Sequence, residues 1–195
     1  MITKNYIHII SCGGFLGSTM SENSSGWVGQ SAIKDYTGKL VTCANGSDSF
    51  NDNGNGNSLR LLQSYLFYPL TPTSYTFELG DDSVSQSGSY VYLGSGKTEP
   101  TYDDYTLESV IPVSKLKVKS MSKTRQYDFK TLCDINIIVE NVSTEDIDVS
   151  EIGLFAFLYK STMPPTREWY LLARDTFDTI TMKPGEIRSF VMTIK

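Results

Sequence analysis

The chain has 195 residues, of which 39% are hydrophobic and 20% are charged, and its formal net charge is −5. This length suits one substantial domain, or a domain with an appendage, and the composition excludes a disordered chain. The acidic balance disfavours nucleic acid as a partner, and no stretch is long and apolar enough to predict membrane insertion.

The three cysteines, Cys12, Cys43 and Cys133, form no close pair. An odd number of widely spaced cysteines disfavours a disulfide framework, and the lack of a Cys-x-x-Cys pair disfavours a zinc site. We therefore expect reduced thiols and a protein that folds in a cytoplasm. The apolar run at residues 6–10, which precedes Ser11-Cys12-Gly13, is about half as long as the core of a secretory signal, so we expect a short strand or helical turn there, with a lipoprotein signal as the alternative.

The first 60 residues are the least regular part of the chain. Glycine, serine and asparagine dominate residues 11–29 and 44–57, and these residue types favour turns and cannot build a core. Residues 36–43, between the two stretches, predict a strand. Residues 59–70 predict a short helix or a strand, and residues 75–79 alternate as a strand does.

The rest of the chain predicts a series of short strands. They are expected at residues 89–93, 113–121, 132–140, 152–159, 169–173 and 187–194. Residues 152–159 are almost continuously apolar, which is typical of a strand buried on both faces. Pro184 and Gly185 predict a turn before the last strand, which makes Gly185 a candidate fold residue.

Short strands about every ten residues, separated by turn-forming residues, favour a sandwich or barrel over an α/β fold. We therefore predict a mostly β protein. The expected architecture is an antiparallel β-sandwich of the jelly-roll or Ig-like type, with a loop-rich N-terminal region. Residues 1–84 are expected to be a docking region with a few strands, and residues 85–195 the β-sandwich domain.

Two stretches of the sequence resemble a known class of proteins. Residues 90–109 read as a strand followed by G-x-G-x-x-x-P-x-x-x-D-x-x-L-E. Further along, E-I-G-L-F, L-L-A-R and P-G-E follow one another before a terminal strand. In this order and spacing the stretches resemble structural proteins of tailed-bacteriophage virions, as found in tails, baseplates and head appendages. The resemblance covers about residues 90–195 and implies a structural protein of the virion, with its location there left open.

The residues of the first stretch also have a physical interpretation. Gly94 and Gly96 predict a sharp exit from a strand with positive backbone torsions. Pro100 predicts an extended segment, and an aspartate at 103–104 predicts the cap of a short turn. Leu107 is then expected to anchor this turn to the core.

The second stretch predicts how two strands pack. Glu151 is expected at the start of a strand, and Gly153 is expected to permit a close backbone approach or a bulge. Leu154 and Phe155 point to opposite faces, which implies burial on both. Arg174 is expected to end the paired strand and to bridge Glu151. These are roles in the fold or in an interface, and none of them needs a reactive group.

Two loops have partial resemblance to ligand-binding motifs. Residues 94–98 resemble a phosphate loop, but Val91 stands where that motif needs glycine, and Glu99-Pro100 disfavours the helix that must follow. In a calcium-loop register, residues 49–60 place Arg60 where a bidentate glutamate is required. We expect a packed or flexible loop there and leave an irregular calcium site as the alternative.

Other reactive groups are candidates by residue type alone. His8 is the only histidine, it lies between two isoleucines, and we expect it to be structural. The carboxylates that glycoside hydrolysis could use are Asp103, Asp104, Glu108, Glu151 and Asp175.

Two further groups of residues are interpreted as surface or core. A basic group that reads as a solvated strand face, with phosphate binding as the alternative, is Lys115, Lys117, Lys119, Lys123 and Arg125. Aromatics that suit core or interface packing, with sugar stacking as the alternative, are Tyr65, Phe67, Tyr68, Tyr75, Tyr90, Tyr92, Tyr102 and Tyr105.

We therefore expect no catalytic, cofactor-binding or metal-ligating residue, no cofactor and no enzymatic activity. The preferred hypothesis is a structural component of a tailed-bacteriophage virion, attached to the capsid or in the neck, tail or baseplate. It would assemble in the bacterial host cytoplasm and pack against copies of itself and other virion proteins. The first alternative is a fibre or tail-tip module that binds a receptor or host surface glycan, and the second is a polysaccharide depolymerase.

Overall fold

The computed structural model describes residues 1–3, 5, 32–38, 40–42, 77–81, 88–125, 133–160 and 166–194. The strands are β1 (Ala32–Lys34), β2 (Leu40–Thr42), β3 (Gly88–Gly94), β4 (Leu116–Arg125), β5 (Cys133–Asn141), β6 (Ile147–Lys160), β7 (Thr166–Met182) and β8 (Ile187–Ile194). A single 3-10 turn, η2 (Val113–Lys115), precedes β4.

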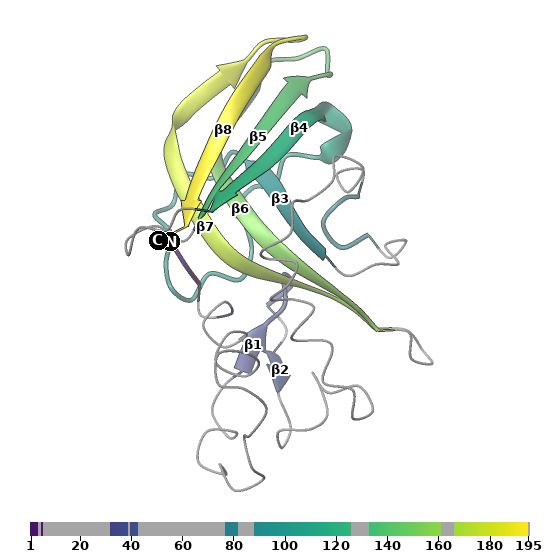
Figure 1. Cartoon of the computed structure of the whole chain (residues 1–195), viewed down its shortest axis with the longest axis vertical. Coiled ribbons are helices and arrows are strands. Elements are labelled where there is room, and N and C mark those ends of the chain that lie inside the picture. The colour runs from purple at the N-terminus through teal and green to yellow at the C-terminus, as the bar shows by residue number, and fades with distance from the viewer. Residues whose placement is uncertain are drawn as a thin grey trace, which may run out of the picture.

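Two antiparallel sheets of three strands each form the body of the molecule (Figure 1). One sheet has the order β3-β6-β7 and the other β4-β5-β8. The chain passes between them repeatedly, because the hairpin β4–β5 lies in one sheet, the hairpin β6–β7 lies in the other, and β8 returns to the first. The mostly β fold and the antiparallel sandwich predicted from the sequence are confirmed.

The main core lies between the two sheets. Alternate residues of β5 and β8 point inward, with Ile137 of β5 and Met192 of β8 each 1% exposed. From the other sheet Val91, Leu154 and Leu172 join the same apolar cluster. Burial of this apolar surface on both sides is what holds two such sheets face to face.

The sheet β3-β6-β7 is buried on its outer face as well. A second apolar cluster there contains Tyr90, Tyr92, Leu107, Phe155, Phe157, Trp169 and Leu171. The rings of Phe157 and Trp169 lie 4.5 Å apart. Leu154 and Phe155 therefore face opposite cores, as predicted for a strand buried on both faces.

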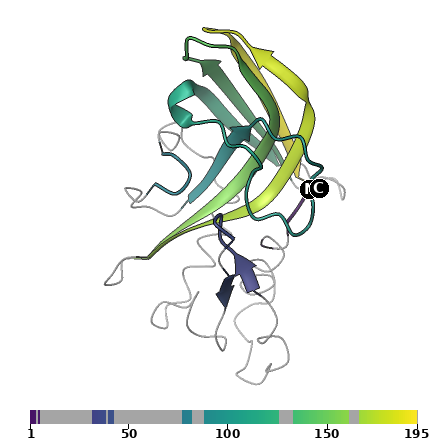
Figure 2. The ribbon, with the colours of Figure 1, turned by 180° about the vertical axis from the view of Figure 1, so that it is seen from behind.

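Three described segments cover this outer face. They are residues 34–38, residues 77–81 and the long connection 95–113, which Figure 2 shows crossing in front of the sheet. The backbone N–H of Tyr36 donates to the carbonyl of Trp169 at 3.0 Å, and the Tyr92 hydroxyl donates to the carbonyl of Phe77 at 3.1 Å. The molecule thus has a third layer on one sheet, built partly from the region predicted to be loop-rich.

The N-terminal residues pair with the outer edge of β7. Ile2 lies opposite Ala173, and the N–H of Thr3 donates to the carbonyl of Leu172 at 2.9 Å. The Thr3 hydroxyl also donates to the carbonyl of Leu171 at 2.7 Å. This part of a strand edge is therefore covered, which removes backbone groups that would otherwise pair with other chains.

Several predicted bounds are wrong in detail. Residues 36–43 were expected as one strand, but Tyr36 and Thr37 form the turn between β1 and β2, where Gly38 has a φ of 82°. The described part of the strand predicted at 75–79 is a turn that ends at Gly80, with a φ of 91°. β6 and β7 extend well beyond the predicted strands because they also pair through polar residues.

Other predictions fall outside the residues that the structure describes. They concern the helix or strand at 59–70, the asparagine-rich tract at 44–57, His8, and the aromatics from Tyr65 to Tyr75. Within the described ranges, no helix combines the length and apolar character needed to cross a bilayer.

Candidate functional site

Polar residues of the two stretches that resemble virion proteins, residues 90–109 and the later segments with Glu151 and Arg174, meet on the outer face of the sheet β3-β6-β7. Glu151 lies in β6 and Arg174 in β7, near each other in the register of the hairpin. A β-bulge between Val149 and Glu151 sets Ser150 of β6 opposite three residues of β7, and after it Glu151 faces the same side as Phe155. Without this bulge the strand alternation would turn the carboxylate of Glu151 into the core between the sheets.

Glu151 is completely buried, and both of its carboxylate oxygens accept hydrogen bonds. Oε1 accepts from the backbone N–H groups of Gly96 at 3.0 Å and Ser109 at 2.8 Å. Oε2 accepts from the N–H of Glu108 at 3.1 Å and from Nε of Arg174 at 3.0 Å. The four hydrogen bonds offset the cost of taking this carboxylate out of water, and they tie the connection after β3 to the sheet at two separate points.

Arg174 is also buried and contacts three carboxylates. Its Nε donates to Glu151, its Nη1 donates to Oδ2 of Asp104 at 2.8 Å, and its Nη2 lies 3.7 Å from Oε2 of Glu108. Burial acts to lower the pKa of Arg174, but the hydrogen bonds and negative charges of Asp104 and Glu151 outweigh it and raise the pKa. The guanidinium therefore remains charged, and it joins β6 and β7 to the covering loop.

Asp104 and Glu108 fasten the loop to itself as well as to Arg174. Oε2 of Glu108 accepts from the N–H groups of Lys97 and Thr98, each at 2.8 Å. Hydrogen bonds from Thr98 and Lys97 lower the pKa of Glu108. Asp104 accepts from the N–H of Thr101 at 2.9 Å. Burial acts to raise the pKa of Asp104, but the hydrogen bonds from Thr101 and Arg174 lower it overall.

Gly94 and Gly96 are needed here because a side chain at either position would not fit. The prediction that they adopt positive backbone torsions was wrong. Positive φ occurs among the described glycines at Gly38, Gly80 and Gly185, and not at these two. A Cβ on Gly94 would lie 2.3 Å from Oε1 of Glu151, and a Cβ on Gly96 would lie 2.6 Å from the same atom. The two glycines let the backbone approach the buried carboxylate closely enough to donate to it.

Leu107 and Gly153 form the apolar floor of the site. A Cβ on Gly153 would lie 2.7 Å from Cδ2 of Leu107, so the leucine side chain rests on the bare backbone of β6. Leu107 is buried in the same cluster as Phe155, which confirms that it anchors the loop to a core. The close approach predicted at Gly153 is made by this side chain.

The remaining predicted residues lie near the site or away from it. Pro100 is half-buried in the connection between β3 and η2. Gly185 belongs to the β7–β8 turn, where its φ is 77° and the N–H of Glu186 donates to the carbonyl of Lys183 at 2.9 Å. This turn packs on Asn141, whose carbonyl accepts from the N–H of Gly185 at 2.8 Å.

The predicted contact between Arg174 and Glu151 is confirmed, but the predicted positions in the strands are wrong. Glu151 is the fifth residue of β6, and Arg174 lies in the middle of β7. Both strands continue through polar residues past the cluster, and apolar runs alone did not indicate this.

Sequence reasoning missed that Asp104 and Glu108 surround the same arginine. Glu108 was considered only as a carboxylate by type, and Asp104 only as such a carboxylate or as the cap of a short turn. They are, however, the D and the E of the first phage-like stretch, and Arg174 is the R of the second. The first stretch carries two carboxylates and the second carries an arginine, and this opposite charge in two distant stretches was the available signal for an ion cluster.

The arrangement is suited to holding a loop. The pKa values of Asp104 and Glu108 are lowered, whereas a general acid needs a raised one. No α-helix follows residues 94–98 within the described connection to β4, and the amides of Lys97 and Thr98 bind Glu108. In the described part of the chain, no group of three or more His, Cys, Asp or Glu is placed to hold a metal ion.

The described aromatics divide between core and surface. Tyr90 and Tyr92 are buried and pack on Trp169, so they belong to the core rather than to a sugar-stacking surface. Tyr105 lies under the ammonium of Lys34, which is 5.2 Å from the ring centroid. Tyr102 is exposed.

Comparisons of the chain with protein-family models, with curated proteins and with solved structures give no match. The features of the chain that bear on its function are the fold, the cluster around Arg174 and the resemblance of the two stretches. Of these, the cluster is the feature that joins the stretches in space.

Proposed function

We propose that this chain is a structural component of a tailed-bacteriophage virion, attached to the capsid or in the neck, tail or baseplate, and that it acts by packing subunits together. The observation that carries the proposal is the cluster of Glu151, Arg174, Asp104 and Glu108. It brings together the polar residues of the two stretches that resemble virion proteins. All of its charged groups are used to fix one loop on one sheet.

A structural role accounts for how the polar groups are used. Glu151 has its oxygens occupied by three backbone N–H groups and a guanidinium, which leaves no lone pair aimed at a substrate. Arg174 is held between carboxylates and is 4% exposed at its side chain. Groups committed in this way stabilise one loop conformation and are poorly placed to move protons.

The proposal includes the partners and the place of action. The proposed partners are copies of the chain and other virion proteins. Nucleic acid and membranes are not proposed as partners, and no cofactor is proposed. The protein would assemble in the host cytoplasm and remain in the virion. The third layer on the sheet β3-β6-β7 is in line with this, because it covers one sheet face and Ile2 covers part of the β7 edge, which leaves the loops and the other sheet as contact surfaces.

A receptor- or glycan-binding module of a fibre or tail tip is the second candidate. The observation that favours it is Tyr102, an aromatic exposed on a loop that is fixed from beneath. An aromatic face next to carboxylates can stack on a sugar ring and bind its hydroxyls. A polysaccharide depolymerase is the third candidate, because Asp104, Glu108 and Glu151 lie around one arginine.

Deletion of the gene in the phage or prophage that encodes the chain tests the proposal. We expect electron microscopy to show particles that lack a component or stop at an assembly intermediate, and we expect the chain supplied in trans to restore them. Complete particles with normal attachment and plating in its absence would reject a structural role. Binding to a glycan array, or shortening of capsular polysaccharide by the purified chain, would favour the second or third candidate.

A further inference from the structure

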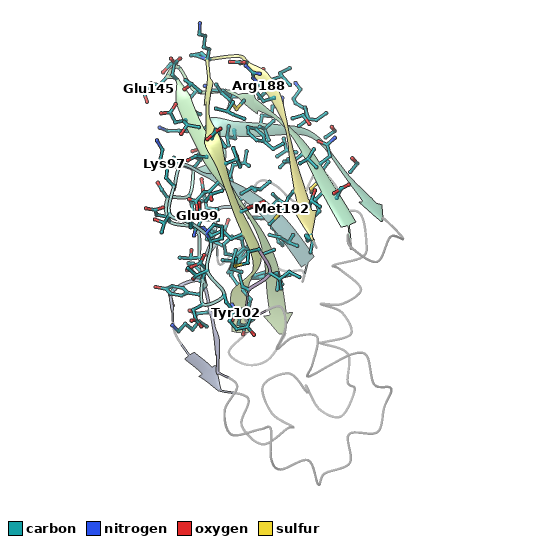
Figure 3. All side chains as sticks on the ribbon, turned by 90° about the vertical axis from the view of Figure 1, so that its left-hand side faces the viewer. Lys97, Glu99, Tyr102, Glu145, Arg188 and Met192 are labelled. Carbon is teal, nitrogen blue, oxygen red and sulfur yellow. The ribbon has the colours of Figure 1, made fainter. Side chains whose placement is uncertain are left out.

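The sheet β4-β5-β8 turns one face to solvent in the described part of the chain. In Figure 1 this sheet lies in front of the sheet β3-β6-β7, and no described segment crosses its outer face. Figure 3 shows Lys97, Glu99 and Tyr102 of the covering loop on one side of the molecule, and β8, where Met192 is labelled, toward the other side. The chain therefore covers the outer face of one sheet and leaves that of the other bare.

Strand pairing shows which residues form this bare surface. Ile135, Ile137 and Val139 of β5 belong to the main core, so the residues between them point outward. Their partners on β4 and β8 point the same way. We name this surface the open face, and its middle consists of Ser120, Ser122, Asn136, Ile138, Ser189 and Val191.

Three branched apolar residues lie next to one another on the open face. Val191 is 59% exposed and Ile187 is 52% exposed. Ile138 is half-buried and lies opposite Ser189, so Ile187 and Val191 are its two diagonal neighbours on β8. Single exposed apolar residues are ordinary on a protein surface, but a group of neighbouring ones favours a contact surface.

Charged residues are absent from the middle of the open face and lie at its two ends. Lys117, Lys119 and Glu140 are at one end, where Lys119 and Glu140 lie 3.0 Å apart, and Asp134 is at the other end. The centre of a protein interface is depleted of charged residues, and its rim is polar. The open face therefore has the composition of an interface.

The polar groups in the middle are partly paired with one another. The Ser189 hydroxyl donates to Oδ1 of Asn136 at 2.7 Å, across the pair of strands β5 and β8. Polar groups that already have a partner cost less to bury than groups that lose a water molecule without replacement. Covering the open face is therefore less unfavourable than the number of serines suggests.

The balance of charge indicates which partner the open face fits. The whole chain has a formal net charge of −5, whereas the two lysines and the two carboxylates of the open face cancel. The excess negative charge lies outside this face, so two copies meet here without the repulsion that this excess causes.

We propose that the open face packs against the open face of a second copy, with Ile138 and Val191 in the middle of the contact. Such a contact has two-fold symmetry, because both copies use the same surface. It stacks one three-stranded sheet on another, as the two sheets of a sandwich do inside one molecule.

The inference rests on the proposed function, since it names the surface for subunit packing, and it has a separate test. Three strands form a small face, so we expect a weak dimer that is seen at protein concentrations up to about 1 mM. Sedimentation velocity of the full chain over a concentration series measures it. Because the centre of the contact is uncharged, association should persist in high salt and strengthen in ammonium sulfate.

Substitution by lysine at matched positions gives the sharpest comparison. Val191→Lys should weaken self-association at least about tenfold, because it brings two charges into a two-fold contact. The same change reduces the net negative charge of the chain, which by itself would favour association. Thr179→Lys is the control, because Thr179 is an exposed β-branched residue of β7 in the other sheet, and it should associate as the original chain does.

Two further measurements keep the comparison interpretable. Val191 and Thr179 are both exposed, so each lysine variant should unfold at the same temperature as the original chain when diluted to monomer. Val191→Thr keeps the branched shape without adding a charge, and it should weaken association less than Val191→Lys does.

Three results would overturn the inference. The first is a chain that remains monomeric at every concentration and salt. The second is self-association that Val191→Lys leaves unchanged or that Thr179→Lys weakens equally, which would leave subunit packing through another surface intact. The third is a monomeric chain that Val191→Lys excludes from particles, which would assign the open face to a different virion protein. Conversely, a dimer that Val191→Lys disrupts, together with absence of the chain from particles, would reject the virion role and keep this contact.

Discussion

At the scale of single residues, the molecule depends on one buried carboxylate. Glu151 is fully buried, and its two oxygens bind Arg174 and three backbone N–H groups from a loop more than 40 residues away in sequence. A buried charge without its partner is strongly destabilising, whereas a complete set of partners keeps a unique geometry. The cluster should therefore behave as one unit.

A double-mutant cycle tests this unit. We expect Glu151→Ala to lower the free energy of unfolding by about 3–5 kcal/mol, because it leaves Nε of Arg174 and three backbone N–H groups without an acceptor. Arg174→Ala should have a similar effect, and the double variant should lose less than the sum of the two. Urea denaturation provides the measurement. Single variants as stable as the original chain, or strictly additive losses, would contradict the buried pair.

Substitution of the glycines around the Glu151 carboxylate by alanine should destabilise the protein through steric crowding. Gly94→Ala and Gly96→Ala place a methyl group within 2.6 Å of Oε1 of Glu151, so we expect each to lose about 1–3 kcal/mol of stability. Gly185→Ala is the control, because its Cβ meets nothing within 4 Å and only the positive φ resists it, at about 1 kcal/mol. Combining Gly94→Ala with Glu151→Ala should remove part of the steric penalty, because two of the three atoms nearest to that Cβ belong to the Glu151 side chain. Equal effects at all three glycines would argue against the crowding.

At the scale of strands, irregular pairing decides which side chains point where. In β4 the register shifts between Val118 and Ser120, which leaves Lys119 as an extra residue. Val118 before the shift and Met121 after it both pack on the main core, although they are three positions apart. A regular strand would turn one of the two to solvent, so the bulge keeps both apolar residues inside.

Deletion of single residues tests the role of this bulge. Removing Lys119 should leave every other pairing of β4 in place, and we expect a loss of stability below about 1 kcal/mol. Removing Lys117 shifts the alternation, which either turns Leu116 outward or brings Lys119 toward the core. We expect a loss of about 2 kcal/mol or more in that case. Thermal unfolding of the two deletion variants compares them directly, and equal losses would reject this register.

These elements show which parts of the structure the sequence could predict. Alternating apolar residues predicted the strands at 132–140 and 187–194 almost to their observed bounds, because inward packing requires that period. The contact between Arg174 and Glu151 was predicted from charge. The bulges at Ser150 and Lys119 were not predictable, since a register shift depends on the partner strand rather than on local composition. The covering layer was missed for a similar reason, because polar turn sequences do not show which sheet face they cover.

At the scale of the whole molecule, the free energy of unfolding should depend on pH through two carboxylates of the covering loop. The pKa values of Asp104 and Glu108 are lowered in the folded protein from ordinary values of 3.8 and 4.5. The unfolded chain therefore takes up protons first as the pH falls. The stabilisation is complete above the ordinary values and is lost as the pH falls through the lowered ones.

Urea denaturation between neutral pH and pH 3 measures this dependence. We expect the free energy of unfolding to fall below about pH 4.5, and the fall to be smaller in a variant with Asp104→Asn and Glu108→Gln. Glu186, in the β7–β8 turn, also has a lowered pKa, so Glu186→Gln should reduce the fall by a separate amount. An identical pH dependence with and without Asp104 and Glu108 would show that their lowered pKa values do not contribute.

The buried charges around Arg174 hold the covering loop on one sheet, and the proposed role of the chain is to pack against neighbouring virion subunits. The measurement that tests it most directly is quantitative mass spectrometry of gradient-purified particles of the encoding phage, before and after a high-salt wash. We predict that the chain remains in the particles as several copies, in the same ratio to the other virion proteins in every preparation. A chain found only in the soluble fraction of the lysate, with none in the particles, would contradict the account.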